Sequence, residues 1–273
     1  MLLSRLLTAI VLIPLVVGGI LYLPSQILAL VIGAFILIGA REWSLLSGFK
    51  AVVAQLGFAV LVAAALALMF FVVQAGQHVL MQMLAALAWS LATVLLVLRR
   101  QPLQPVIGQR PGVLLLGVLV LAIAWMSIVL LHQQAERGPQ LVLFLFVLIW
   151  TADSGAYFAG RAFGKHKLSP HVSPGKTWEG VAGAMLGALV CALVLDQLQL
   201  VGLPPLPLIG LCLLVTAVSI GGDLLESVLK RQAQMKDSGN LLPGHGGALD
   251  RIDSLLAAAP VFVIGLSLLE QAA

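Results

Sequence analysis

Long apolar runs constrain this chain more than any other feature of its sequence. Stretches of 18 or more residues with few or no charged side chains recur along its length. Each is long enough to cross the hydrocarbon core of a membrane, roughly 30 Å thick, as a helix. Only 10% of the residues are Asp, Glu, Lys or Arg, against about 25% in a typical soluble domain. The sequence therefore predicts an all-α, polytopic integral membrane protein.

Proline, glycine and polar residues divide the apolar runs into nine expected helices. Their approximate bounds are residues 6–23, 26–40, 52–73, 79–98, 113–131, 141–159, 180–196, 206–225 and 255–271. The first run resembles a signal peptide, but it lacks an A-x-A-like cleavage site and another run follows at once. We therefore expect the first run to be retained as a membrane-spanning helix.

The basic residues predict how the helices are oriented. If successive loops alternate between the two sides of the membrane, one side receives 14 of the 15 Lys and Arg residues and the other receives only Arg137. The positive-inside rule assigns the basic side to the cytoplasm. We expect a cytoplasmic N-terminus and, with nine spans, a C-terminus on the opposite side.

Polar residues gather in the second half of the chain. Residues 1–140 carry little besides apolar helices, and we interpret them as a scaffold of about five spans. Residues 141–273 contain two long loops on the cytoplasmic side, at about 160–179 and 226–254, which hold nearly all the polar side chains suited to chemistry. We therefore expect the second region to be the catalytic one.

The second of these loops joins two acidic helix ends through a glycine-rich turn. Residues spaced to share one helix face occur at both ends: Asp223, Glu226, Ser227 and Lys230, then Asp250, Asp253 and Ser254. Mg²⁺ prefers one or two protein carboxylates together with substrate phosphates and water. Lys and Arg neutralise phosphoryl charge, and the backbone N–H groups of Gly246 and Gly247 suit an anion-binding nest. The pattern predicts a site for a nucleotide or a phosphorylated substrate.

Charges at helix ends also have a simpler interpretation, since many of them only set the topology of a membrane protein. An acidic residue at the centre of a span costs about 2.5–3.5 kcal/mol on insertion scales and therefore marks function. Asp223 lies near the end of its run, where this cost is lower. Its pairing with Asp250 and Asp253 is what favours a functional site.

The first polar loop contains a pattern that suggests a phosphate-binding loop. Gly175, Lys176 and Thr177 form its last part, but the G-x-x-x-x-G-K motif requires glycine where Pro170 stands, and no strand is expected before it. We therefore reject a P-loop. Ser173 and the proline after it predict instead the start of a short helix, with Lys176 exposed near its first turn.

These residues together resemble a known family. The C-terminal part resembles the motif of phosphatidate cytidylyltransferases, also called CDP-diacylglycerol synthases, at Ser227-x-x-Lys230-Arg231, Lys236-Asp237, His245-Gly246-Gly247 and Asp250-Arg251-x-Asp253. Two upstream blocks resemble the same family at Asp153-x-Gly155-Ala156-Tyr157 and Ser173-Pro174-x-Lys176-Thr177-Trp178-Glu179-Gly180. Gly175 stands where some members carry a second Lys. The resemblance covers roughly residues 150–254, and the first 140 residues match only as apolar helices.

The resemblance implies a reaction of phospholipid biosynthesis, in which CTP and phosphatidic acid give CDP-diacylglycerol and pyrophosphate with Mg²⁺. It implies a bacterial cytoplasmic (inner) membrane protein whose active site faces the cytoplasm. There CTP meets a lipid that stays anchored in the bilayer. The expected partners are CTP and phosphatidic acid, and no nucleic acid.

The resemblance also implies roles for individual residues. The expected Mg²⁺ ligands are Asp223 and Asp250. Residues that could hold a second cation or support the first are Asp253, Glu226 and Asp153. The expected phosphate-binding residues are Lys230, Arg231, Lys236, Arg251 and Lys176. The expected pocket for the triphosphate or leaving group is lined by His245, Gly246 and Gly247, and further substrate contacts are Ser227, Asp237, Ser173 and Thr177.

Other interpretations of the sequence are a transporter, a different lipid transferase and a purely structural membrane protein. A transporter would be compatible with nine spans, but the charges gather on one membrane face. Transferases that use DDxxD or DGxxAR clusters are disfavoured because neither string occurs. A GxxxG pattern at Gly183 and Gly187 indicates close helix packing and in some proteins a dimer seam, which leaves a homodimer open.

Overall fold

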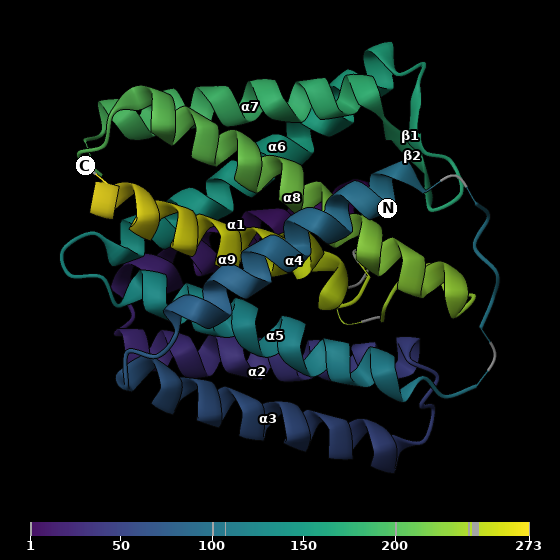
Figure 1. Cartoon of the computed structure of the whole chain (residues 1–273). Coiled ribbons are helices and arrows are strands. Elements are labelled where there is room, and N and C mark those ends of the chain that lie inside the picture. The colour runs from purple at the N-terminus through teal and green to yellow at the C-terminus, as the bar shows by residue number, and fades with distance from the viewer. Residues whose placement is uncertain are drawn as a thin grey trace. The chain divides into compact units, whose positions relative to one another are not determined.

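The computed structural model describes residues 2–99, 101–106, 108–199, 201–239, 241 and 246–272, with side chains from residue 10 onward. These residues form nine α-helices and one two-stranded sheet (Figure 1). The helices are α1 (Leu2–Tyr22), α2 (Ser25–Leu46), α3 (Val52–Gln74), α4 (Val79–Leu98), α5 (Pro111–His132), α6 (Gly138–Phe163), α7 (Trp178–Gln197), α8 (Pro205–Gln232) and α9 (Leu249–Ala272). The predicted all-α class is confirmed.

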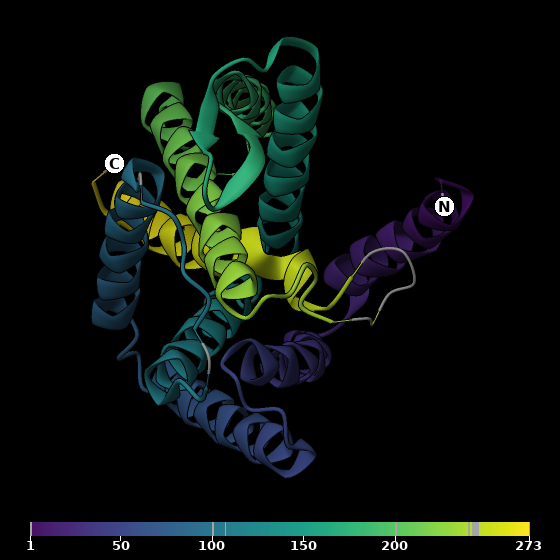
Figure 2. The same cartoon turned by 90° about the vertical axis from the view of Figure 1, so that its right-hand side faces the viewer.

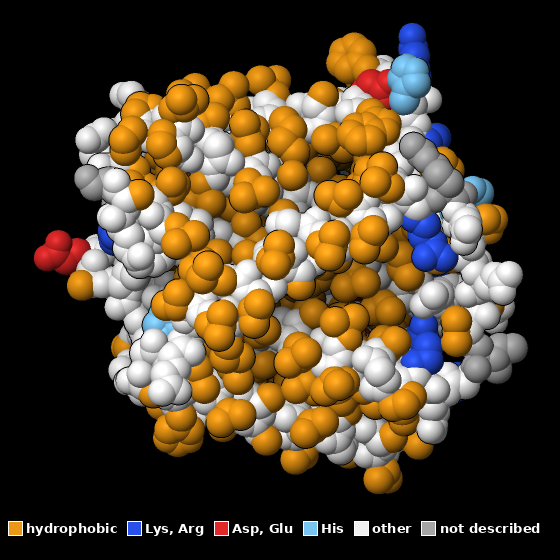
Figure 3. Space-filling model, in the orientation of Figure 1, with side chains coloured by type: hydrophobic (Ala, Val, Ile, Leu, Met, Phe, Trp, Pro, Cys, Tyr) orange, Lys and Arg blue, Asp and Glu red, His pale blue; other side chains and the backbone are white. Residues whose placement is uncertain are grey.

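The helices have the length and apolar character that a membrane requires. Within the described residues, the eight helices from α2 to α9 are long and apolar enough to span a membrane, whereas the described side chains of α1 form a shorter apolar segment, Ile10–Tyr22. Hydrophobic side chains dominate the face drawn in Figure 3. The predicted polytopic membrane protein is confirmed, and a span at α1 stays a prediction.

Two helices near the predicted site are longer than their apolar runs indicated. Helix α8 continues to Gln232 instead of ending near residue 225, and α9 begins at Leu249 instead of near residue 255. A helix continues for as long as its backbone hydrogen bonds are made, and strong helix formers such as Leu, Glu, Lys and Arg extend α8 beyond its apolar part. The loop between the two helices is therefore shorter than predicted.

The short helix predicted at Ser173 is wrong, because this segment is a strand. Strands β1 (Lys167–Ser169) and β2 (Ser173–Thr177) form an antiparallel hairpin, with Lys167 opposite Thr177. Figure 2 shows the hairpin as two arrows. Proline and glycine are poor helix formers, and Thr177 is extended, with φ −133° and ψ 157°. The next helix, α7, begins at Trp178 and corresponds to the span predicted over residues 180–196.

Contacts divide the chain into two compact units, each assembled from three separate stretches. Unit 1 comprises Met1–Gln77, Gln104–Leu143 and Leu229–Ile252, and unit 2 comprises His78–Leu103, Phe144–Val228 and Asp253–Ala273. These units do not coincide with the predicted scaffold at residues 1–140 and the predicted catalytic region at residues 141–273. That functional division stays a prediction.

In unit 1, α2, α3 and α5 pack against one another. Tryptophan side chains hold α2 and α5 together, since Trp43 donates its indole N–H to the carbonyl of Val113 at 2.8 Å and Trp125 donates to the carbonyl of Ala29 at 2.8 Å. Gly117 makes room for the Trp43 ring, because a Cβ at this position would overlap the indole. This packing fixes the position of α2, which carries a polar residue of the site.

In unit 2, glycines bring α6 and α7 close together. A Cβ on Gly155 or Gly183 would collide with the backbone of the other helix, and Gly187 lies against Thr151 of α6. The GxxxG pattern therefore serves helix packing within the chain. The hairpin is held by Leu168 and Val172, which are buried in a cluster with apolar side chains of α8.

The predicted orientation leads to an experiment on accessibility. In a variant whose two buried cysteines, Cys191 and Cys212, are replaced by Ala, single cysteines at His171 and Asp237 are expected to react with a membrane-impermeant maleimide only from the cytoplasmic side. A cysteine at Gln271 is expected to react only from the opposite side. All three positions are exposed. Reaction of the cysteine at Asp237 from the outside would contradict the nine-span orientation.

Candidate active site

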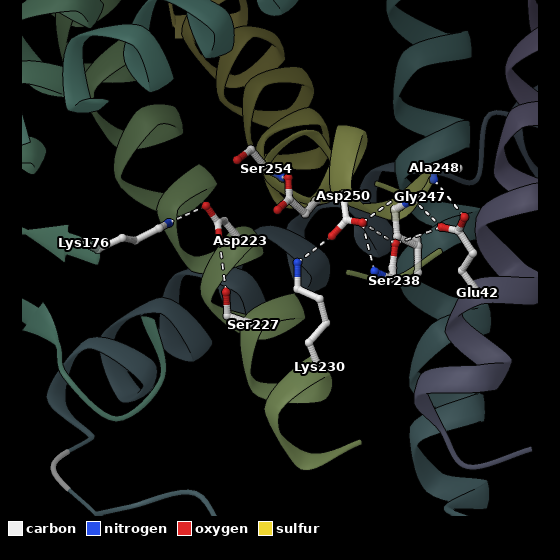
Figure 4. A network of polar contacts seen from close by, with 12 residues as sticks. Glu42, Lys176, Asp223, Ser227, Lys230, Ser238, Gly247, Ala248, Asp250 and Ser254 are labelled. Carbon is white, nitrogen blue, oxygen red and sulfur yellow. Dashed lines mark hydrogen bonds and ion pairs between the residues drawn. The ribbon is translucent and has the colours of Figure 1, made fainter. Parts of the chain in front are cut away.

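The ion pair between Lys176 and Asp223 forms one candidate cluster of functional residues, within unit 2 (Figure 4). The ammonium of Lys176 on β2 lies 2.7 Å from Oδ2 of Asp223 on α8. The hydroxyl of Ser227, one turn along α8, donates to Oδ1 of Asp223 at 3.2 Å. The hairpin thus places Lys176 in direct contact with Asp223, and both residues were predicted as site residues from the sequence. The sequence predicted both residues and left their direct contact open.

Asp253 of α9 lies near other acidic side chains of unit 2. Its carboxyl group forms a hydrogen bond with Glu226 and is close enough to Asp223 for a direct electrostatic interaction. The backbone N–H of Ser254 donates to Asp253 at 2.7 Å. Gly222 permits this approach, because a Cβ there would collide with the backbone carbonyl of Asp253. Three of the predicted cation-binding residues therefore gather in this unit.

A separate candidate cluster is centred on Asp250, within unit 1 (Figure 4). The ammonium of Lys230, near the end of α8, lies 2.6 Å from Oδ1 of Asp250, and both side chains are largely buried. Oδ2 accepts hydrogen bonds from the backbone N–H of Ser238 at 2.9 Å, from its hydroxyl at 2.9 Å and from the N–H of Gly247 at 2.8 Å. Asp250 therefore fixes the loop as well as the lysine.

Glu42 lies in the region interpreted as scaffold, and it was not among the site residues predicted from the sequence. Its carboxylate, on α2, is 6% exposed and accepts hydrogen bonds from Ala248, Leu249 and Ser238. One signal could have found it, since Glu42 is the only acidic residue among the first 135. A lone carboxylate at the end of an apolar run is costly unless it is satisfied by partners.

Arg110 is a second residue that the sequence analysis missed. Its guanidinium donates to the side-chain oxygen of Gln232 at 2.7 Å and to the carbonyl of Leu46, and the N–H of Val106 donates to the carbonyl of Gln232 at 3.0 Å. Partial burial lowers the pKa of Arg110 from its ordinary value, but an arginine stays charged at neutral pH. These bonds join the ends of α2 and α8 within unit 1.

The remaining predicted site residues are mostly at the surface. The exposed ones are Arg231, Lys236, Asp237, Arg251 and Asp153. Ser173 is partly buried on β2, and Gly246 is partly buried with a φ of 83°. His245 lies outside the described residues. Thr177 is buried, and its hydroxyl accepts from the N–H of Gly180 at 3.1 Å as the N-cap of α7.

An apolar pocket of about 240 Å³ lies within unit 2. Its lining comes from α4, α7, α8 and Leu168 of β1. The residues of α7 and α8 in this lining include Trp178, two positions after Lys176, and Ile220, three positions before Asp223. Residues that line the pocket are thus close in sequence to both members of the Lys176–Asp223 pair.

The model of the cytidylyltransferase family matches residues 3–269. The chain belongs to the cytidylyltransferase family. It is 45% identical over 263 residues to a phosphatidate cytidylyltransferase of Pseudomonas aeruginosa, with 96% of each chain covered. It is 37% identical over 280 residues to one of Haemophilus influenzae, with 96% of this chain and 97% of the relative covered. The family predicted from the motifs is confirmed, and the chain is a nucleotidyltransferase.

The two predicted Mg²⁺ ligands of this cytidylyltransferase-family chain are carboxylates, the oxygen donors that this cation takes in proteins. Both predicted ligands, Asp223 and Asp250, have a cationic ammonium on one carboxylate oxygen, at 2.7 Å and 2.6 Å. Among the described residues no three His, Cys, Asp or Glu side chains form a metal-binding group. Mg²⁺ does not require such a cage, because it is usually held by one or two carboxylates together with substrate phosphates and water.

Proposed function

We propose that this chain transfers the cytidylyl group of CTP to phosphatidic acid, giving CDP-diacylglycerol and pyrophosphate, with Mg²⁺ as cofactor. The observation that carries the proposal is the similarity over 96% of the chain to relatives named phosphatidate cytidylyltransferase. The basic residues around the candidate site support it, because both proposed reactants are strongly anionic.

We place the reaction on the cytoplasmic side of a bacterial inner membrane. The relatives are bacterial, and 14 of the 15 basic residues fall on the side that the positive-inside rule assigns to the cytoplasm. This location would let a water-soluble nucleotide reach a lipid head group at the membrane surface.

The proposed chemistry is a substitution at phosphorus. An oxygen of the phosphate monoester of phosphatidic acid attacks the α-phosphorus of CTP. The bond between this phosphorus and the oxygen that leads to the β-phosphorus breaks, and its electron pair leaves with pyrophosphate. The task of the protein is to hold two anions in line and to stabilise the charge that develops.

The side chains of the two ion pairs suit this task. Lys176 and Lys230 lie beside the proposed Mg²⁺ ligands, Asp223 and Asp250, and we assign both lysines to neutralising phosphate oxygens. The exposed arginines and Lys236 would attract the nucleotide to the surface. Bound Mg²⁺ would polarise phosphoryl oxygens as a Lewis acid.

The apolar pocket of unit 2 supports a lipid as the second substrate. Its lining, with the exception of Thr93, consists of apolar side chains such as Val94, Met185 and Ile220. We assign the pocket to part of one acyl chain of the lipid, because hydrophobic side chains favour apolar ligands. Two lining residues, Trp178 and Ile220, are close in sequence to Lys176 and Asp223. An acyl chain bound in the pocket would therefore leave the head group of the lipid near these charged residues.

The choice of nucleotide tests the proposal. The purified protein in mixed micelles is expected to form a nucleotide-linked lipid from phosphatidic acid with CTP or dCTP, and only poorly with ATP or GTP. The measurement is the rate of lipid product formation with each nucleotide at equal concentration and with Mg²⁺ present. Equal rates with all nucleotides would contradict cytidylyl specificity, and no product with any of them would contradict the proposed reaction.

A further inference from the structure

The described side-chain hydrogen bonds of Glu42 all go to the loop between α8 and α9 and to the first residue of α9 (Figure 4). Oε1 accepts from the N–H of Ala248 at 3.0 Å. Oε2 accepts from the N–H of Leu249 at 2.8 Å and from the hydroxyl of Ser238 at 3.0 Å. These bonds offset the cost of burying a carboxylate. Glu42 of α2 is therefore hydrogen-bonded to the loop that carries the family motif between α8 and α9.

The residue just before α9 cannot cap the helix with its own side chain. The helix begins at Leu249, so Ala248 occupies the position where Ser, Thr, Asp or Asn usually accepts from the first N–H groups. Alanine has no acceptor in its side chain. Glu42 supplies one from 206 positions away in the sequence, and its negative charge also suits the positive end of the helix dipole.

Ser238 connects Glu42 to Asp250. Its fully buried hydroxyl lies 3.0 Å from Oε2 of Glu42 and 2.9 Å from Oδ2 of Asp250. A hydroxyl has a single proton to donate, so the two carboxylates share one donor. A displacement of Glu42 would therefore change the hydrogen bonds of Asp250, which also holds Lys230.

Two glycines of the loop allow this close contact. A Cβ on Gly239 or on Gly247 would collide with the carboxylate of Glu42, and a Cβ on Gly247 would also collide with the hydroxyl of Ser238. The absence of a side chain at both positions is what lets the backbone approach the buried acid.

Arg110 connects the end of α2 to the end of α8, where the loop begins. Arg110 donates to the carbonyl of Leu46, in α2, and to the side chain of Gln232, which ends α8 two residues after Lys230. The end of α2 therefore contacts both flanks of the loop within unit 1, directly through Glu42 and by way of Arg110.

We infer that Glu42 is a positioning residue, which fixes the start of α9 and, through Ser238, holds Asp250 and Lys230 in the geometry that the reaction uses. This inference rests on the proposed function, because Asp250 and Lys230 matter only if they serve that reaction. In this inference Glu42 acts through Ser238 and Asp250 and not by touching a reactant.

The test replaces Glu42 by Gln, and by Asp as the conservative variant. The amide of Gln presents an NH₂ group to N–H or O–H donors in either orientation, so at least one bond of the network is lost. We expect kcat per folded molecule to fall by about 10–100-fold, as for residues that orient metal ligands, and the half-saturating Mg²⁺ concentration to rise. Glu42→Asp keeps the charge and is expected to recover part of kcat.

Ser44→Ala is the matched control, since Ser44 is a buried residue of the same helix whose hydroxyl has no hydrogen-bond partner among the described residues. It is expected to leave kcat and the Mg²⁺ dependence unchanged. If Glu42→Gln does not fold, Ser238→Ala replaces it. That variant removes the shared hydroxyl but keeps the bonds of Glu42 to Ala248 and Leu249, and we expect a loss of kcat of about tenfold.

Hydrogen exchange gives a second readout that does not depend on activity. Amides of residues 246–252 are expected to exchange faster in Glu42→Gln than in the wild type or in Ser44→Ala. Unchanged exchange together with unchanged kcat would overturn the inference. So would a loss of folded protein with normal kcat per folded molecule, because it would leave Glu42 a purely structural role. A wild-type protein without transferase activity would refute the proposed function instead, while the exchange result still reports on the cap.

Discussion

Replacement of Asp250 by Asn is expected to lower turnover by on the order of 10³-fold or more, which corresponds to about 4 kcal/mol of transition-state stabilisation. The carboxylate accepts from Lys230 on one oxygen and from Ser238 and Gly247 on the other. An amide of the same shape has one acceptor and one donor, so its NH₂ group would face a donor on one side. It would also lack the negative charge that a cation requires.

Insertion of this variant into the membrane is expected to change little, whereas the folded protein is expected to be less stable because the largely buried Lys230 loses its charged partner. Asp250 lies in the first turn of α9, and the rest of this helix is an apolar span. The measurement is kcat of the purified variant over a series of Mg²⁺ concentrations. Near-normal turnover at saturating Mg²⁺ would refute the assignment of Asp250 as a ligand.

Replacement of Asp223 by Asn is expected to have an effect of similar size, on the order of 10³-fold in turnover. Its carboxylate has the ammonium of Lys176 at 2.7 Å and accepts from Ser227 at 3.2 Å. The variant removes the negative charge that pairs with Lys176 and that we propose as a ligand of Mg²⁺. The double variant of Asp223 and Asp250 is expected to be little worse than either single one, as for groups that serve one reaction step.

Acidic residues outside the candidate site provide the control for both variants. Glu136, in the turn between α5 and α6, and Asp196, near the end of α7, are predicted to lie on the far side of the membrane. Glu136→Gln and Asp196→Asn are expected to retain wild-type turnover. A similar loss in these controls would show that the effect is not specific to the site, and an active Asp223→Asn enzyme would refute its role as a ligand.

Hydropathy was sufficient to predict each of the nine helices that the described residues form, because a span must bury a long apolar surface in lipid. It was not sufficient to predict the ends of α8 and α9, since these helices continue into polar sequence that carries the motif. Hydrogen bonding within the backbone, and not apolarity, decides where such a helix ends.

The sequence predicted most residues of the candidate site, but it predicted few of the contacts between them. Spacing placed Asp223 and Ser227 on one helix face, and their hydrogen bond confirms it. The partner of Asp223 was not predictable, because Lys176 reaches it from a hairpin where a short helix was expected. Glu42 could not be found by local spacing, since its partners lie more than 190 positions away.

The reaction that we propose transfers the α-phosphorus of CTP, with its cytidine, to the phosphate of phosphatidic acid. The most direct measurement supplies CTP with radioactive phosphorus at either the α or the γ position and follows the label into lipid and into pyrophosphate. We expect the α label in the lipid product and the γ label in pyrophosphate, in equal amounts. Appearance of the γ label in the lipid would show phosphoryl transfer instead and would contradict the proposed reaction.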